Sequence, residues 1–260
     1  MIPTFTVNDI FVMMQTLNTK TLIGFADPFR DNSKLEVEKE WENTYKKLHK
    51  LKLLDLVDGE VKLQDEFARA LWIMSRTNLV VEILKDTEHK SLFYFDKENV
   101  VECSLKGEGL YTLYMHGAPD TTWNNVIYPR MLAGVQKRKV EINEEIYIKT
   151  ADYNSWLLKG ININVEKLEK IDGNENKERA FHMLKQSYEN KIHNIRLMIF
   201  YKENMKWSVE GTNILTSSIS NWTFKMINKN GVELLEGKQC TNLEIVVEIL
   251  DVLRRMKKFV

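Results

Sequence analysis

The chain is poor in the residues that build flexible linkers and disulfide-bonded scaffolds. Of its 260 residues only four are proline and eleven are glycine, which leaves little room for disordered linkers. Its two cysteines, Cys103 and Cys240, stand far apart, in apolar or element-edge contexts. Such a pair lacks the spacing of a zinc site, and we expect two buried thiols in a reducing compartment. A disulfide between them is the alternative.

An excess of charge of either sign is also missing. The 37 basic and 37 acidic residues give a formal net charge of zero, whereas a protein that binds nucleic acid through phosphate contacts usually carries surplus Lys and Arg. The charge balance therefore argues against nucleic acid as the main partner. The N-terminus lacks the basic and apolar regions of a signal peptide, and no stretch approaches the roughly 18 apolar residues of a membrane span. We expect no signal peptide, no membrane span and a cytoplasmic location.

Common catalytic motifs are absent as well. The sequence contains no G-x-S-x-G elbow, no P-loop, no G-x-G-x-x-G and no H-E-x-x-H. None of its five histidines has a recognised metal-ligand spacing. We therefore expect a protein that is not an enzyme and needs no metal or cofactor. A cleft in which titratable groups converge would reopen the enzyme hypothesis.

What the chain does contain is a run of short strands between Asn78 and Met115. Four segments are rich in β-branched and aromatic residues: Asn78–Lys85, Ser91–Phe95, Val100–Ser104 and Leu110–Met115. The breaks between them are short, which predicts antiparallel hairpins, because a parallel crossover needs a dozen or more residues. Apolar residues at helical spacing stand on both sides of the run, at Phe67, Leu71 and Met74 before it and at Trp123, Ile127 and Met131 after it.

The same order of elements recurs in the second half of the chain. A helical stripe is formed by Phe181, Leu184, Tyr188 and Ile192. Strand-like segments follow at Asn194–Tyr201, Lys206–Glu210, Asn213–Ser218 and Asn221–Ile227, before a last helix from Thr241. Helix, meander and helix therefore occur twice, in halves of about 1–139 and 140–260 that meet near a connector at Gly134–Lys139. This order predicts an α+β fold; a true internal repeat and a coincidence both account for it.

Three helices carry a side chain that can cap their first turn. The pairs of capping residues are Thr6 with Asp9, Ser33 with Glu36, and Thr241 with Glu244. Of the six tryptophans, Trp156 and Trp207 stand beside polar segments, and we expect these two to be the most exposed. An exposed tryptophan is a good anchor for a protein interface.

Two basic runs raise a second hypothesis. Lys46–Lys52 precedes a hairpin-like segment, as in a winged-helix DNA-binding protein, although leucines interrupt its charges at core-like spacing. The other run, Arg254–Lys258, complements the negative end of its helix dipole.

The passage from the first helix to the meander carries a family resemblance. It comprises Val7-Asn8 at the opening of the first helix, the stretch Leu48–Leu63 with its Asp58-Gly59 turn, the segment Phe67–Met74 and the meander from Asn78. In this order of elements the chain resembles the EspG family, the cytosolic chaperones of type VII (ESX) secretion. The resemblance implies a quasi-two-fold fold, in which two helix–antiparallel meander–helix halves form a central sheet flanked by helical bundles.

The resemblance also implies a function. It points to a chaperone or adaptor that keeps a helical secreted protein soluble before export by covering its apolar surface. The Lys-, Asn- and Ile-rich composition favours a client of the WXG or LXG type over a PE–PPE pair. We expect client contacts at two turns of the meander, at one tryptophan and on the last helix: Asp86, Lys90, Asp96, Lys97, Trp207, Leu243, Val247 and Leu250. A winged-helix-like regulator and an immunity protein that neutralises a partner toxin are the alternatives.

Overall fold

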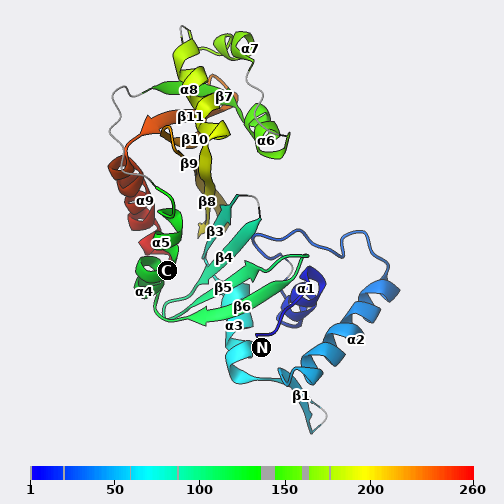
Figure 1. Ribbon diagram of the computed structural model, residues 1–260. Helices are drawn as coiled ribbons and strands as arrows, with labels where there is room; N and C mark the ends of the chain where they lie inside the picture. The colour runs from blue at the N-terminus through cyan, green and yellow to red at the C-terminus, as the bar shows by residue number, and fades with distance from the viewer. Residues whose placement is uncertain are drawn as a thin grey trace.

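The structure, a computed structural model, describes residues 2–19, 21–58, 60–86, 88–135, 144–159, 164–175 and 177–260. This part of the chain contains a nine-stranded antiparallel sheet in the order β6-β5-β4-β3-β8-β9-β10-β11-β7 (Figure 1). A separate two-stranded sheet is formed by β1 (Leu54–Val57) and β2 (Glu60–Leu63). Helices cover both faces of the large sheet, so the fold is α+β, as predicted.

The first half of the chain builds one end of the large sheet. Its helices before the meander are α1 (Val7–Thr16), α2 (Lys34–Lys50) and α3 (Asp65–Arg76). The strands of the meander are β3 (Leu79–Lys85), β4 (His89–Phe95), β5 (Val100–Leu105) and β6 (Tyr111–His116). A helical segment then follows as α4 (Pro119–Thr122), a π-helical turn η1 (Trp123–Ile127) and α5 (Tyr128–Met131).

The second half builds the other end. It begins with β7 (Glu145–Lys149), α6 (Thr150–Lys159), α7 (Val165–Glu169) and α8 (Glu178–Glu189). Its meander consists of β8 (Lys191–Glu203), β9 (Lys206–Ser217), β10 (Asn221–Lys229) and β11 (Val232–Cys240). The chain closes with α9 (Asn242–Met256) and a short 3₁₀ turn, η2 (Lys257–Phe259).

The two meanders meet at their first strands. β3 and β8 pair antiparallel from Leu79 opposite Tyr201 to Lys85 opposite Ile195. From this central pair each meander runs outward to its own edge of the sheet. The result is the quasi-two-fold arrangement that the resemblance implied.

Alternation along the strands sends side chains to two different faces. On one face, α9 and the α4–α5 segment pack together over residues such as Val81 of β3 and Leu197 of β8. On the other face, two separate cores form, one beneath α1–α3 and one beneath α6–α8. The middle of this second face therefore lies between two helical bundles.

The three predicted helix caps are confirmed. Each cap is a reciprocal pair, in which the Ser or Thr oxygen accepts from a backbone N–H and the carboxylate three residues on accepts in return: Thr6 with Asp9, Ser33 with Glu36, and Thr241 with Glu244. Such a cap stabilises a helix by about 1 kcal/mol. These short polar patterns therefore mark where α1, α2 and α9 begin.

Several predictions about the second half need correction. Ile192, predicted as the last residue of a helical stripe, lies in β8, because α8 ends at Glu189. Lys206–Glu210 and Asn213–Ser218 belong to a single strand, β9. The sequence showed no strand at Val232–Cys240, where β11 forms and pairs with β10. Trp156 is buried rather than exposed, because α6 turns it toward the core, where its ring lies 6.5 Å from that of Tyr153.

Trp207 is exposed as predicted, but Trp72 on α3, which was not predicted to be exposed, is more exposed than Trp207. Both cysteines are free and buried, and their burial raises the pKa of each thiol, that of Cys240 to about 12. The predicted boundary near residues 139 and 140, with most of its connector, lies outside the described residues, as does Gly59 of the predicted turn. Among the described helices, none is both long enough and apolar enough to cross a membrane.

Candidate protein-binding surface

The turn between β3 and β4 places two predicted contact residues in ion pairs within the fold. Asp86 Oδ2 lies 2.9 Å from His193 Nδ1 at the start of β8. Lys90 Nζ lies 3.2 Å from Glu82 Oε2 and donates to the carbonyl oxygen of Gly24 at 2.6 Å. Both side chains are half-buried and tie the turn to neighbouring segments. Their contact with a client stays a prediction.

Asp96 and Lys97 are exposed in the turn between β4 and β5. This turn lies at the opposite end of β4 from Asp86 and Lys90, and a seven-residue strand is about 20 Å long. An ion pair of 2.7 Å between Arg69 and Glu98 ties the turn to α3 instead. The two predicted turns therefore do not form one continuous surface.

The last helix exposes part of its apolar surface. Leu243 and Val247, four residues apart on α9, are 65% and 48% exposed, and Leu250 is half-buried on the same side. The opposite side of the helix, with Ile245 and Ile249, is fully buried against the sheet. The α9 stripe (Leu243, Val247 and Leu250) thus joins three of the predicted contact residues on one exposed surface.

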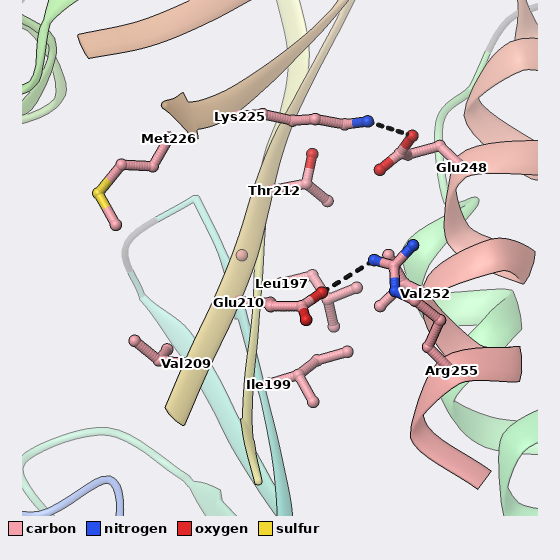
Figure 2. A pocket seen from close by; sticks show the side chains of 11 residues that line it. Leu197, Ile199, Val209, Glu210, Thr212, Lys225, Met226, Glu248, Val252 and Arg255 are labelled. Atoms are coloured by element: carbon pink, nitrogen blue, oxygen red, sulfur yellow. Dashed lines mark hydrogen bonds and ion pairs between the residues drawn. The ribbon is translucent and has the colours of Figure 1, made fainter. Parts of the chain in front are cut away.

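A second apolar surface lies on the sheet itself. We call it the open sheet face, and it comprises Met198 and Phe200 of β8, Trp207 and Val209 of β9, and Met226 of β10. Strand pairing sets Phe200 opposite Val209 and Met198 opposite Gly211, so these side chains share one face. Trp207, Val209 and Met226 are 38%, 44% and 51% exposed. Figure 2 shows Val209 and Met226 on the side of the strands away from α9.

The open sheet face is the uncovered middle between the two helical bundles. Phe200 packs against the core beneath α1–α3, and Phe224, two residues before Met226 on the same face of β10, belongs to the core beneath α6–α8. Gly211 stands at its centre, where a Cβ atom would lie 2.4 Å from the sulfur of Met198. The absence of a side chain at Gly211 therefore lets Met198 lie flat on the sheet.

The sheet also divides at this place. β9 pairs with β10 only from Thr212 opposite Lys225 to Leu215 opposite Trp222. Toward the β8–β9 turn, Lys206–Gly211 pairs with β8 alone, while Met226 and the residues after it pair with β11. The division keeps β9 accessible along its edge, where almost every residue from Lys206 to Gly211 is exposed.

Trp207 borders a hollow of about 440 Å³ beside the open sheet face. The hollow is lined by the ends of α1 and α3, including Leu17 and Met74, and by the cationic side chains of Arg76 and Lys202. Trp and Arg are the residues most often enriched where protein interfaces gain their binding energy. The hollow thus extends the open sheet face with an aromatic and basic rim.

A smaller cleft, about 220 Å³, lies beneath α9 where β9 and β10 diverge, and Val209 and Met226 of the open sheet face also line it (Figure 2). Two ion pairs span it: Lys225 Nζ to Glu248 Oε2 at 2.6 Å, and Arg255 Nη2 to Glu210 Oε2 at 2.8 Å. Its floor includes the apolar side chain of Leu197. These pairs fix α9 to β9 and β10, so we assign the cleft to the fold rather than to a ligand.

One buried polar cluster invites a test for chemistry. Glu102 of β5 is held by Arg130 Nη1 at 2.6 Å, by His116 Nε2 at 2.8 Å and by Ser104. Burial alone would raise the pKa of Glu102, but the hydrogen bonds from Arg130, Ser104 and His116 lower it to about 2. A carboxylate held ionised in this way is a poor general acid or base near neutral pH. The described residues contain no group of three or more His, Cys, Asp or Glu able to hold a metal ion.

The open sheet face includes one predicted residue, Trp207, and four that were not predicted. Strand periodicity carried a usable signal for Val209, since Trp207 and Val209 are two apart in a strand and must share a face. Met226 could not be assigned in this way, because its place depends on where β10 leaves β9.

Comparison with known proteins gives a likeness of fold. No family model matches the sequence, and no curated protein matches it either. Among solved structures, the chain is similar to the type VII secretion system chaperone EspG5 of Mycobacterium tuberculosis, solved in complex with a PE25–PPE41 dimer. The two share 10% sequence identity and align with a TM-score of 0.60 over 97% of this chain and 96% of that one. From one end to the other, this chain therefore has an EspG-like fold.

Proposed function

We propose that the protein is a chaperone or adaptor that binds a helical protein of the WXG or LXG type and keeps it soluble before type VII export. The observation that carries the proposal is the open sheet face, an exposed apolar surface between two helical bundles. The likeness of fold to EspG5, a chaperone solved with a bound PE25–PPE41 dimer, supports the same function.

A helix is the partner that suits this surface. On this face of the large sheet, helices α1–α3 and α6–α8 lie on either side of the open sheet face. A sheet buries its apolar face most effectively against another layer of secondary structure. A client helix laid across Val209 and Met226 would complete the helical layer and bury its own apolar surface in the same step.

The α9 stripe supplies a second apolar surface for a large client. It lies on the helix that covers the other face of the sheet, so one short helix cannot contact both surfaces. The function needs no cofactor, and the affinity must stay finite because the client has to leave for export.

Co-expression tests the proposal. The protein is produced with each small helical WXG- or LXG-type protein encoded near it, and stable pairs are isolated by affinity and size-exclusion chromatography. We expect one such protein to co-purify and to become insoluble when expressed alone. Failure of every candidate to co-purify would contradict the proposal.

A pair of matched variants then locates the surface. Val209→Asp places a charge on the open sheet face, and we expect it to abolish co-purification because the carboxylate would be desolvated against apolar groups. Leu35→Asp is the control, because Leu35 is an exposed apolar residue on α2, 76% exposed, away from the open sheet face. Equal loss of binding in both variants would refute the assignment of the surface.

A further inference from the structure

The stretch Lys206–Gly211 of β9 is an unprotected edge inside the sheet. It pairs with β8 on one side, and among the described residues no strand pairs with its other side. Alternate residues of an antiparallel strand direct their N–H and C=O groups to either side. This edge therefore presents backbone donors and acceptors that another strand can bind.

The two outer strands of the same sheet, β6 and β7, each have free backbone groups occupied by hydrogen bonds from another part of the chain. At β6, the backbone N–H groups of Phe5 and Tyr111 each donate to the other's carbonyl oxygen at 2.8 Å. At β7, the side-chain amide of Asn174 accepts from the N–H of Tyr147 at 2.7 Å and donates to its carbonyl oxygen at 2.6 Å. No comparable cover lies on Lys206–Gly211 in the described part of the chain.

The sequence of this edge is complementary to itself. We propose that it pairs antiparallel with the same edge of a second copy of the chain, around a two-fold axis at Ser208. In that register Lys206 lies opposite Glu210 of the second copy, and Trp207 lies opposite its Val209. Two ion pairs and two aromatic–aliphatic pairs then surround two small Ser208 side chains, and pairs of these kinds stabilise neighbouring strands.

Other registers lose this match. If the two-fold axis stood at Val209 instead, Ser208 of one copy would lie opposite Glu210 of the other. Lys206 would then have no acidic residue opposite it. A shift by a single residue would place apolar side chains of one copy on the polar face of the other. A lone lysine on an edge strand discourages pairing, but here Glu210 stands at the two-fold-related position and turns repulsion into attraction.

Pairing at this edge uses the backbone and leaves the open sheet face free. Lys206, Ser208 and Glu210 point to the side of α9, where Glu210 also accepts from Arg255 at 2.8 Å. Trp207 and Val209 point to the other side. The dimer would therefore join the open sheet faces of its two copies into one larger apolar surface.

Sedimentation velocity of the isolated protein tests the dimer, from about 1 µM to about 300 µM, a range suited to a small interface. We expect a reversible monomer–dimer equilibrium. Lys206→Glu and Glu210→Lys should each raise the dissociation constant of the dimer by about tenfold or more, because like charges would face each other. An equimolar mixture of the two variants should restore the dimer, since every introduced charge then faces an opposite one.

The controls separate this interface from others and from unfolding. Lys34→Glu makes the same charge change on α2, where the side chain is 92% exposed, and should leave the equilibrium unchanged. Thermal melting of Glu210→Lys checks that loss of the Arg255 contact has not unfolded the chain. A wild-type protein that is monomeric throughout, or a mixture that fails to restore the dimer, overturns the proposal. No client is present, so the result is independent of the proposed function.

Discussion

Trp207 is the residue whose removal should weaken client binding most. It is 38% exposed, and a tryptophan can bury about 250 Å², so roughly 95 Å² remains for a partner to cover. At about 25 cal/mol per Å² this area is worth about 2 kcal/mol. Trp207→Ala should therefore raise the Kd for the client by about 30-fold, as measured by isothermal titration calorimetry with the purified client.

A matched tryptophan provides the control. Trp72 is 53% exposed on the outer side of α3, beneath the guanidinium of Arg76, which lies 4.7 Å from the ring centre. Trp72→Ala removes a similar exposed ring that lies outside the open sheet face. Because Arg76 also lines the hollow beside Trp207, Trp72→Ala should change the Kd far less than Trp207→Ala, by about twofold. A large effect of Trp72→Ala with none of Trp207→Ala would refute the placement of the client on the open sheet face.

Three further predictions concern the fold. Asn204 and Met205 form the β8–β9 turn with φ of +50° and +64°. Because glycine adopts a positive φ without strain, Met205→Gly should raise the free energy of unfolding by about 0.5–1 kcal/mol, as measured by urea unfolding. A lower free energy of unfolding in this variant would contradict the prediction. Glu102 has a pKa lowered to about 2, so its ion pair with Arg130 stabilises the fold above the unfolded pKa, near 4, and loses that effect as the pH falls toward 2. Glu102→Gln should therefore lower the free energy of unfolding by about 2 kcal/mol at pH 7, after allowance for the exposure of Arg130, and by progressively less below pH 4. A difference in free energy of unfolding between variant and wild type that does not change with pH would argue against the ionised pair. Burial raises the pKa of the Cys103 and Cys240 thiols, so a thiol reagent should modify both only after unfolding, and rapid labelling of the native protein would show that they are accessible.

Local patterns accounted for much of the fold. The Thr6, Ser33 and Thr241 caps depend only on residues three apart, so they could be recognised without knowing the tertiary structure. The strands of the first meander are rich in β-branched residues and separated by short polar breaks, which makes their pairing readable from sequence.

Features that depend on distant contacts were missed. β11 contains Gly237 and several charged residues, yet it forms a strand because it pairs with β10 on one side and with β7 on the other. A Cβ atom on Gly237 would lie 2.8 Å from the ring of Phe224. Trp156 follows polar residues, yet three positions after Tyr153 it falls on the buried side of α6. The strands that pair with β11 lie in other elements, and so does Tyr188 of α8, whose ring lies 6.5 Å from that of Trp156. No local pattern contains these partners.

The candidate site likewise has one part that local sequence patterns predict and one part that depends on distant contacts. The exposure of Trp207 could be predicted from its polar neighbours, and its strand position also places Val209 on the same face. The open sheet face as a whole could not be predicted, because it exists only where β9 and β10 part after Thr212 and Lys225.

Hydrogen–deuterium exchange on the purified complex tests the central claim most directly. Exchange is compared with and without client at a concentration low enough to keep the free protein monomeric. If a helical client covers the open sheet face, peptides containing Trp207–Gly211 and Met226 should gain protection, while α2 stays unchanged. Protection confined to α2 or to the β1–β2 hairpin, with none at Trp207–Gly211, would contradict the account.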